Sequence, residues 1–517
     1  MRPIIIKPFL LLSLCIVLLI GVTALGQEER SVWTPPQVLG EGWWQSITVD
    51  RQGNTHIAWY GVSDGGDDNH DNDLDALLYT SRAFGGDWTP VNDVIVTGSG
   101  GYTVRNALAA TSDGILHAVF RAGTRHQFSN ALIPQADTAA AWRREVGISS
   151  FGYYVDMVAD HNDVLHIVYS GREADIANLP FSLEGDICPQ CSDLYYRRSE
   201  DGGRSWSTPF NLTRDVDAGS DRPSIWEGAN GRLFVIWDVG EDWYVGRGRA
   251  RGVGLRYSDD GGMTWSEMIL LDGGGDPDRR PTQIAATDLR DGRLMTVWRY
   301  ANDEDRQIYF QLTSDLETWT PPEPIEGIYA RSIEDCSLDN YELRTDPLGI
   351  VHLFVVGQPE LNSTANPSLY HIEFRQDRWA TRQRVFYSAE ARPEWPTAAI
   401  GPQGDIHLAW FVRSIPEGTS VIDSCTVGLE VYYSYRGPLL ANRPTQAFNP
   451  TRTPQPTPTL VHALQPTATA LPSVEPVDNP VVSTTRDTYA AQVFVGGTLA
   501  VVFFCGGVIA VMRFWRR

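Results

Sequence analysis

The sequence predicts an all-β protein built from a repeated unit of four short strands. Tryptophans that open a strand recur along the chain, at Trp33, Trp88, Trp142, Trp206, Trp265, Trp319 and Trp379. Between successive tryptophans lies a second recurring element, a turn that leads into an apolar strand, as in DRQGNTHIAW and GPQGDIHLAW. Outside the two ends of the chain, no long segment has the 3.6-residue period of a helix.

The repeat also predicts how the two ends of the domain meet. The seventh unit has its inner strands around His407 and a third strand around Tyr432, but no tryptophan follows. Val32 to Leu39 matches the missing fourth strand, so we expect it to complete the last unit beside the C-terminal strands. Such closure removes a free sheet edge. Repeats of this kind build a β-propeller, here expected with seven blades.

Three turns of the repeat share one motif: SEDGGRSW from Ser199, SDDGGMTW from Ser258 and the shorter TSDLETW from Thr313. The hydroxyl and the Asp bond local backbone N–H groups, glycines take the φ > 0 positions, and the Trp opens the next strand. The residues predicted to build these turns are Ser199, Asp201, Gly203, Trp206, Ser258, Asp260, Gly262, Trp265, Asp315 and Trp319.

The motif resembles the Asp box of sialidases and related β-propellers, over roughly Val32 to Arg436. In that family Asp boxes are structural turns, and sialidases have six blades, so six blades is the alternative to seven. The resemblance implies one of two functional classes. One is a surface glycosidase of sialidase type, and the other is a non-catalytic propeller that binds glycan or protein at the cell surface.

The two ends of the chain predict its cellular location. Residues 1–26 read as a secretory signal peptide, with Arg2 and Lys7 before an apolar run and a small-x-small ending. The propeller is expected over 27–442, a stalk rich in Pro and Thr over 443–487, a transmembrane helix over 488–512 and a basic cytoplasmic tail over 513–517. We therefore expect a single-pass protein of the cell membrane with its large domain outside.

The formal charge of −22 argues against a nucleic-acid partner, which would require a basic face. Glycans of the cell surface or the environment, or a protein ligand, are the expected partners. An acidic loop between the second and third strands of the first unit offers Asp64, Asp67, Asp71 and Asp73 to calcium, but its spacing lacks the EF-hand pattern and favours a solvated acidic loop. No other cofactor is expected.

The histidines at equivalent repeat positions are expected to be structural: His56, His117, His166, His352 and His407.

Four cysteines lie in the exported part, namely Cys188, Cys191, Cys336 and Cys425. They allow two disulfides, and spacing alone does not fix the pairing. Cys188 and Cys191 are close enough to pair locally. Cys336 and Cys425 are expected on the same face of neighbouring units. We therefore predict Cys188–Cys191 and Cys336–Cys425.

Function is expected on the face opposite the Asp boxes. Three innermost strands begin with Arg-Pro, and the resemblance to sialidases, which hold a carboxylate with three arginines, implies that role for Arg222, Arg280 and Arg392, with Arg105 in a similar place. The alternative is that Arg-Pro is a structural consensus of the repeat. Aromatic rings suited to sugars are expected at the same rim: Trp43, Trp44, Tyr102, Tyr153, Tyr154 and Trp395.

A sialidase mechanism also requires a Tyr nucleophile activated by a Glu, and an Asp as acid/base. The sequence does not assign these three roles. The acids expected nearest the mouth, and hence the weak catalytic candidates, are Glu173, Asp175, Asp238 and Glu394, followed by Glu241 and Asp242.

Overall fold

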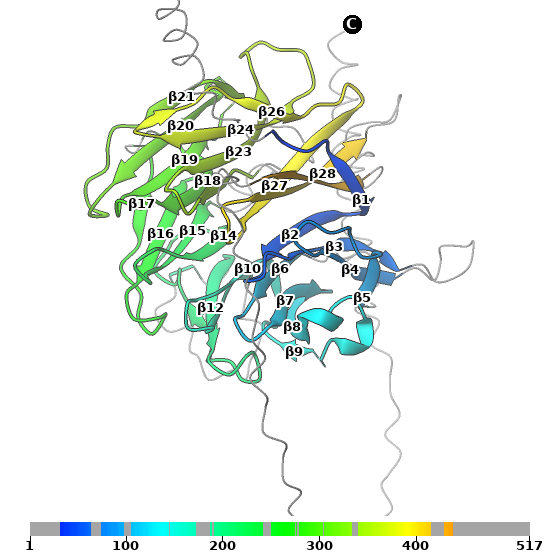
Figure 1. Ribbon diagram of the computed structural model, residues 1–517. Helices are drawn as coiled ribbons and strands as arrows, with labels where there is room; N and C mark the ends of the chain where they lie inside the picture. Colours follow the sequence, from blue (N-terminus) through cyan, green and yellow to red (C-terminus); the bar gives the residue numbers. More distant parts are fainter. Residues whose placement is uncertain are drawn as a thin grey trace, which may run out of the picture. The chain divides into compact units, whose positions relative to one another are not determined.

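The computed structural model describes residues 32–63, 74–97, 105–143, 145–171, 187–188, 191–240, 250–273, 276, 279–302, 304–332, 340–414 and 429–437. Over these ranges the protein is an all-β propeller, with two short 3-10 turns at Ile133–Gln135 and Ala139–Ala141 (Figure 1). The predicted signal peptide, stalk, transmembrane helix and tail lie outside them. No helix in the described ranges is long and apolar enough to span a membrane.

Five sheets of the described chain have four antiparallel strands each. From the innermost strand outward they are β2 (Trp43–Val49), β3 (Thr55–Ser63), β4 (Leu74–Arg82) and β5 (Asn92–Val96); β6 (Asn106–Ala110), β7 (Ile115–Ala122), β8 (Arg125–Leu132) and β9 (Val146–Gly147); β10 (Gly152–Ala159), β11 (Leu165–Gly171), β12 (Asp193–Ser199) and β13 (Phe210–Asn211); β14 (Ser220–Glu227), β15 (Leu233–Val239), β16 (Gly252–Ser258) and β17 (Ile269–Leu271); and β27 (Ala391–Ile400), β28 (Ile406–Ser414), β29 (Leu429–Arg436) and β1 (Gln37–Glu41).

The remaining strands form one nine-stranded sheet, so the structure shows five separate four-stranded blades and not the seven predicted. This sheet contains β18 (Pro281–Asp288), β19 (Leu294–Tyr300), β20 (Gln307–Thr313), β21 (Glu323–Ala330), β22 (Glu342–Thr345), β23 (Val351–Gln358), β24 (Ser368–Arg375), β25 (Arg378–Trp379) and β26 (Gln383–Phe386). The reason is that the end of β21 pairs with β23, through Tyr329↔Gln358 and Ala330↔Gly357. Hydrogen bonding therefore continues where the repeat predicts a boundary.

The innermost strands surround a central channel. In order around it they are β2, β6, β10, β14, β18, β22 and β27; β18 contacts the preceding sheet through β15 and β16, and β27 contacts β2. Figure 1 shows β2, β6, β10, β14 and β27 meeting near the centre. We number the seven repeats of the sequence 1 to 7 by these strands, without implying seven separate blades. Each innermost strand contributes side chains both to the channel and to an apolar layer between neighbouring units.

The N-terminal segment closes the ring, as expected from the repeat. β1 pairs antiparallel with β29, from Gln37↔Tyr433 to Glu41↔Glu430. The backbone N–H of Thr34 also donates to the carbonyl of Tyr435 (2.8 Å). Strands nearly 400 residues apart in sequence thus share one sheet, and the last unit has no unpaired outer edge at β29.

The repeated tryptophans act as wedges between units. Each packs its ring against an aromatic residue of the preceding unit: Trp88 on Tyr433, Trp142 on Tyr79, Trp206 on Phe128, Trp265 on Tyr196, Trp379 on Phe310 and Trp33 on Phe354, with centroids 4.8 to 6.2 Å apart. Trp319 joins the cluster that contains Phe234 and Leu255 of unit 4. Large aromatic surfaces dominate such interfaces because each buries much apolar area.

The Asp boxes form the turns that their sequence predicts. In the first, Ser199 Oγ donates to Asp201 Oδ1 (2.8 Å) and accepts from the N–H of Gly203 (2.8 Å), and the N–H of Ser205 donates to Asp201 Oδ1 (2.9 Å). Gly203 has φ +84°. The hydrogen bonds from Ser205 hold the pKa of Asp201 at about 2. Ser258 and Asp260 repeat these bonds, and Thr313 and Asp315 form the shorter version.

The repeated histidines are structural. In unit 1, His56 lies between Asp50 (Nε2 to Oδ2, 3.4 Å) and the hydroxyl of Tyr79 (2.7 Å). Because a carboxylate only accepts, Nε2 carries the proton and the tyrosine hydroxyl donates to Nδ1. Equivalent pairs occur in units 3 and 7, where His166 contacts Asp160 and Tyr196, and His407 contacts Asp405 and Tyr433.

Unit 6 replaces the tyrosine of this network by His371. His352 Nε2 lies 3.4 Å from Asp346, and His352 Nδ1 lies 2.9 Å from Nε2 of His371. The same logic makes Nδ1 of His371 an acceptor, and the indole N–H of Trp33 points to it at 3.4 Å. The network of unit 6 therefore ends on the segment that closes the ring.

Trp33→Ala should destabilise the whole domain. Trp33 is buried and contacts both Phe354 and His371, so its truncation should lower the free energy of unfolding by about 3 to 5 kcal/mol. Denaturant unfolding of the purified domain measures this. Val32→Ala is the matched control, because Val32 is 75% exposed. Equal stability of the two variants would contradict closure by this segment.

The domain should lose stability as the pH falls below about 6.5. Burial lowers the pKa of His117 to about 4 and that of His126 to about 3, and it also lowers the pKa values of His166 and His371. The unfolded chain therefore binds more protons than the folded domain between pH 6.5 and those values, and stability falls by up to about 1.4 kcal/mol per pH unit for each such group.

Denaturant unfolding at several pH values between 7.5 and 4 tests this. His126→Gln should make the dependence on pH shallower. His161→Gln should not, because His161 is exposed and hydrogen bonding to Glu227 raises its pKa. A flat profile down to pH 4 would refute the expectation.

Candidate functional site at the mouth of the central channel

A cavity of about 360 Å³ lies in the central channel and is lined by the innermost strands. At one end its lining includes Tyr154, Arg222 and Trp395, and at the other it reaches Ala159, beside the turn at Asp160. The pairing of Ala159 with Leu165, and of Leu165 with Ser199, places that second end on the Asp-box side. The first end, which we call the rim, is therefore on the face where ligands were expected.

A β-bulge recurs at the rim. The pairing register shifts between Trp43 and Ser46 in β2, Gly152 and Val155 in β10, Asp221 and Ser224 in β14, Thr282 and Ala285 in β18, and Glu394 and Thr397 in β27. Each shift inserts one extra residue into the innermost strand. Bulges of this kind bend a strand and redirect a side chain, and they are frequent beside binding sites.

Four of these bulges hold a non-glycine residue in the left-handed region: Trp44 (φ 54°), Arg222 (φ 56°), Gln283 (φ 56°) and Trp395 (φ 51°). This conformation is strained for residues with a Cβ, at roughly 1 to 3 kcal/mol each. Its repetition at one place in four units shows that the surrounding sheet imposes it. Strain concentrated at one rim is typical of a functional surface.

Aromatic rings and an arginine pack together at the rim. The guanidinium of Arg105 lies over the rings of Trp44 (4.2 Å), Tyr153 (3.6 Å) and Tyr154 (4.2 Å). Trp44 also packs edge-on against Trp395, with ring centroids 4.7 Å apart. Each arginine–ring contact is worth about 0.5 to 2 kcal/mol. The cluster places a buried positive charge among flat apolar surfaces, as the aromatic residues of the sequence suggested.

Arg222 adds a second positive charge to the rim. Its Nη1 lies 3.3 Å from Oδ2 of Asp238, and its guanidinium lies 5.3 Å from the ring of Trp395. Both members of the ion pair are almost completely buried. Burial raises the pKa of Asp238, although the charge of Arg222 opposes this rise. Asp238, one of the predicted acids, therefore lies beside the rim as the counter-ion of Arg222.

The shared Arg-Pro pattern does not mark one shared position. Arg222 stands in the bulge of β14, whereas Arg280 and Arg392 precede the bulge residues Gln283 and Trp395 of their strands by three positions. Neither Arg280 nor Arg392 is among the described residues that line the channel cavity. Arg280 instead contacts Asp272 after β17, through its carbonyl (2.9 Å) and its carboxylate (3.5 Å). Arg222 therefore lines the cavity, and Arg105, which is not among the lining residues either, lies beside it over the rings of Trp44 and Tyr154.

Glu394 is held by a second buried ion pair. Its oxygens accept from Nε (2.9 Å) and Nη2 (3.1 Å) of Arg413, and Arg331 Nη1 lies 3.9 Å away. All three side chains are buried. This bidentate contact explains Glu394 as a structural group.

Sequence reasoning missed three charged residues deeper in the channel. Asp156, Glu342 and Arg344 line the cavity below the rim. The sequence did contain a signal for two of them, because a carboxylate replaces a small residue at one position of the repeat. The pairing of the first and second strands aligns Asp156 and Glu342 with Ser46, Ala107, Ser224, Ala285 and Thr397 of the other units. Burial raises the pKa of Glu342 to about 7, and the charge of Arg344 opposes that rise.

Several predicted site residues lie outside the described ranges: Glu173, Asp175, Glu241, Asp242, Tyr102, the calcium candidates Asp64, Asp67, Asp71 and Asp73, and the pair Cys336 and Cys425. Cys188 and Cys191 form a disulfide, with Cα atoms 5.4 Å apart. The pairing of Cys336 with Cys425 stays a prediction.

Two sets of described side chains are close enough to share a metal ion. The first is His352, His371 and Glu373. Glu373 is ion-paired with Arg436 and Arg375, and His371 accepts from Trp33, so this set is accounted for by its own hydrogen bonds. The second joins the turn of unit 3 to Glu227 of unit 4, through His161, whose N–H donates to Glu227 Oε2 (2.8 Å). We read both sets as structural contacts.

The fold and the rim define a β-propeller with a charged and aromatic channel mouth, and comparisons with known proteins agree on the fold. No model of a known protein family matches the sequence, and no characterised protein matches it at the sequence level. An ulvan lyase of polysaccharide lyase family PL25 is similar in structure, with a TM-score of 0.50 and 12% identity over 76% of this chain and 99% of the lyase. Its complex with -[GlcA(1-4)Rha3S]- gives the same values.

The intramolecular trans-sialidase from Ruminococcus gnavus, in complex with oseltamivir carboxylate, has a TM-score of 0.40 and 13% identity, over 79% of this chain and 95% of its own. At 12% identity the similarity to the lyase is one of fold, and the predicted β-propeller fold is confirmed at that level.

Glu394→Ala should destabilise the domain, because it leaves the buried guanidinium of Arg413 without its carboxylate. The expected loss is about 3 to 5 kcal/mol of unfolding free energy. Denaturant unfolding measures it, with Glu390→Ala as the matched control, since Glu390 is exposed. If the Glu394→Ala domain is as stable as the control, the interpretation of Glu394 as a structural group is wrong.

Proposed function

We propose that the domain binds acidic glycans at the rim of its channel. The observation that carries the proposal is that Arg105 and Arg222, on neighbouring parts of the rim, stand among the rings of Trp44, Tyr154 and Trp395. Planar guanidinium groups suit the carboxylate of an acidic sugar. Aromatic faces suit the apolar face of a sugar ring, and the cavity size falls within the usual range for small ligands.

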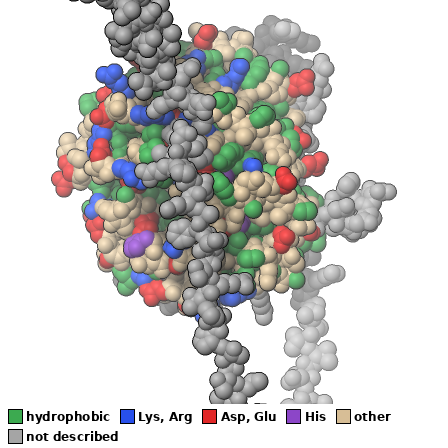
Figure 2. Space-filling view, viewed as in Figure 1, with side chains coloured by type: hydrophobic (Ala, Val, Ile, Leu, Met, Phe, Trp, Pro, Cys, Tyr) green, Lys and Arg blue, Asp and Glu red, His purple; other side chains and the backbone are tan. Residues whose placement is uncertain are grey.

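Electrostatics supports an acidic ligand at this place, despite the strongly acidic chain as a whole. Nη1 of Arg222 lies 3.3 Å from Oδ2 of Asp238, longer than the 2.7 to 2.9 Å of a tight charge-assisted bond. On the surface visible in Figure 2, acidic and basic side chains are interspersed.

Binding is favoured over sialidase-type hydrolysis by the placement of the arginines. The carboxylate-binding set implied by the resemblance was Arg222, Arg280 and Arg392, and only Arg222 of these lines the cavity. The similar ulvan lyase is seen in complex with -[GlcA(1-4)Rha3S]-, an acidic oligosaccharide, which supports an acidic glycan as the ligand proposed here. We therefore propose the non-catalytic class, with hydrolysis as an outcome to be tested.

Two finer features belong to the same proposal. We propose that the nine-stranded sheet consists of two blades joined edge to edge, β18–β21 and β22–β26, which would give seven repeat units around the channel. We also propose that the domain stands outside the cell, anchored by the helix expected over 488–512. The supporting features are the signal-like segment 1–26 and the stalk 443–487 in the sequence.

Arg222→Ala should weaken binding of an acidic oligosaccharide by about 2 to 5 kcal/mol, because it removes one partner of a charged contact. Titration calorimetry of the purified domain with sialyllactose and with a glucuronate oligosaccharide measures the change. Arg280→Ala is the matched control, since it has the same Arg-Pro context but contacts Asp272 instead of the cavity.

A fluorogenic sialoside assay completes this test. Turnover that requires Arg222 would move the protein to the hydrolase class. If Arg222→Ala and Arg280→Ala weaken binding equally, the three-arginine carboxylate site implied by the resemblance to sialidases would be supported instead. Absence of binding to every acidic glycan would leave a protein ligand as the partner.

A further inference from the structure

The channel continues below the rim into a polar section, which we call the throat and define by Gln45, Asp156, Glu342 and Arg344. All four line the cavity. They come from β2, β10 and β22, so they reach the channel from units 1, 3 and 6. The throat is thus built from strands far apart in sequence that ring closure brings together.

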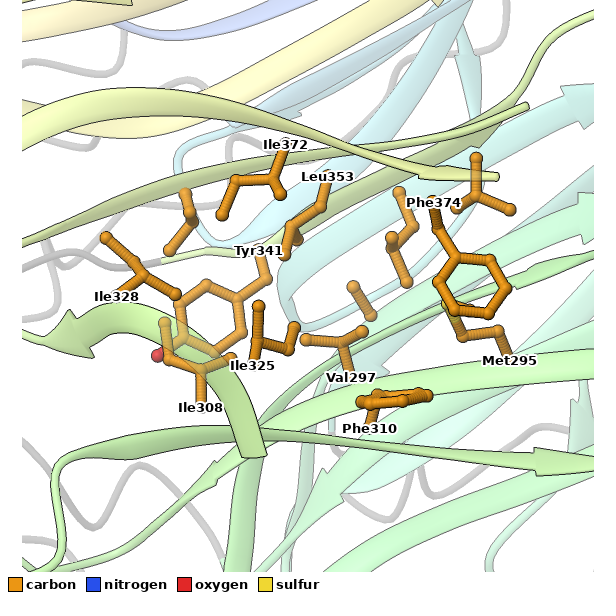
Figure 3. Close-up of a cluster of buried hydrophobic side chains, with 14 of the residues drawn as sticks. Met295, Val297, Ile308, Phe310, Ile325, Ile328, Tyr341, Leu353, Ile372 and Phe374 are labelled. Atoms are coloured by element: carbon orange, nitrogen blue, oxygen red, sulfur yellow. The ribbon is translucent and has the colours of Figure 1, made fainter. Parts of the chain in front are cut away.

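Alternation along β22 turns two of these side chains toward the channel. Tyr341 and Leu343 belong to the apolar cluster between units 5 and 6, and Figure 3 shows Tyr341 pointing among Ile308, Ile325 and Ile328. Side chains at successive positions of a strand point to opposite sides. Glu342 and Arg344 therefore face away from this cluster and line the cavity.

The partners of Asp156 and Arg344 show that both are positioned by neighbouring units. Asp156 Oδ2 accepts from Ser224 Oγ (3.0 Å) and the N–H of Ile225 (2.9 Å), in unit 4. Arg344 Nε donates to the carbonyl of Ala398 (2.9 Å), in unit 7. These contacts hold the ring together, and they fix the charges that surround the throat.

Gln45 and Glu342 differ from Asp156 and Arg344 because each has a side-chain oxygen, Oε1, that can still accept a hydrogen bond. The amide N–H₂ of Gln45 donates to the carbonyl of Trp395 (2.5 Å), but its amide oxygen accepts no hydrogen bond from the described residues, and the side chain is 97% buried. Glu342 is also more than nine-tenths buried; it forms an ion pair with Arg344 (2.6 Å) and accepts from the backbone N–H of Ala398, but its Oε1 accepts no hydrogen bond from the described residues. Because the pKa of Glu342 is about 7, its carboxylate is ionised at pH 8, and an ionised carboxylate offers about four acceptor sites in all.

We infer that the throat is a subsite for a hydroxyl-rich neutral sugar ring, with Glu342 and the amide oxygen of Gln45 as the acceptors of its hydroxyl groups. The inference rests on the proposed function and adds the ligand class: an acidic sugar at the rim joined to a neutral sugar in the throat. Buried acceptors require donors, and a sugar hydroxyl supplies one without adding charge. The carboxylate of the ligand stays at the rim, since Asp156 and Glu342 would repel it from the throat.

The test uses the whole purified propeller domain at pH 8, above the pKa of Glu342, and four probes: N-acetylneuraminic acid, 3′-sialyllactose, glucose and glucosamine. Titration calorimetry should show that sialyllactose binds at least tenfold tighter than the acid alone. Glu342→Gln, which keeps the shape but removes the charge of the acceptor, should weaken sialyllactose about tenfold, as expected for one hydrogen bond to a charged group. It should leave N-acetylneuraminic acid unchanged.

The matched control is Glu326→Gln, an exposed carboxylate on β21 outside the channel lining. If N-acetylneuraminic acid binds but sialyllactose binds no tighter, or if Glu342→Gln affects both ligands equally, the throat inference is overturned while the rim proposal stands. If no acidic probe binds, both fail. Binding of glucosamine stronger than that of glucose would overturn the inference in favour of a cationic group, because an ammonium also donates to these acceptors.

Discussion

Closure of the ring is the constraint on which the rest of the structure depends. Each unit presents an aromatic wedge that packs on the unit before it, so no unit can bury its apolar face alone. In an open array the first and last units would leave such faces in water. The N-terminal segment removes this cost by placing Trp33 on Phe354 and β1 on β29. The channel exists only because closure brings all the innermost strands around one axis.

Closure also explains why polar groups are tolerated inside the channel. Asp156 bonds to unit 4, Asn106 donates to the carbonyl of Trp44 in unit 1 (2.7 Å), and Gln45 donates to the carbonyl of Trp395 in unit 7. Each contact satisfies a buried group and joins two units. Some of the polar groups that line the channel therefore only join units, whereas others can still accept a hydrogen bond from a ligand. A ligand site requires groups of the latter type. A site in this channel therefore depends on the acceptor atoms of Gln45 and Glu342 more than on the charges in the channel.

The repeat in the sequence was sufficient to predict the all-β fold, the turn chemistry of the Asp boxes and the closing strand. These features are local or recur many times, so the pattern specifies them repeatedly. The number of separate blades was not predictable in the same way, because it depends on whether β21 ends before it reaches β23. Two residue pairs decide that, Tyr329↔Gln358 and Ala330↔Gly357, and neither has a sequence signal.

In the site, too, the features that recur in several units were predictable from the sequence, whereas those that depend on a single residue position were not. The aromatic rim was predictable because Trp44, Tyr154 and Trp395 precede the turn-strand repeat in several units. The arginines were misaligned because Arg-Pro occurs at two different distances from the bulge, and a bulge inserts a residue that sequence spacing alone does not reveal. Alignment by strand pairing instead places Arg222 with Trp44, Gln283 and Trp395, and Asp156 with Glu342. Pairing register, rather than motif, is therefore the measure by which residues of different units should be compared in this channel.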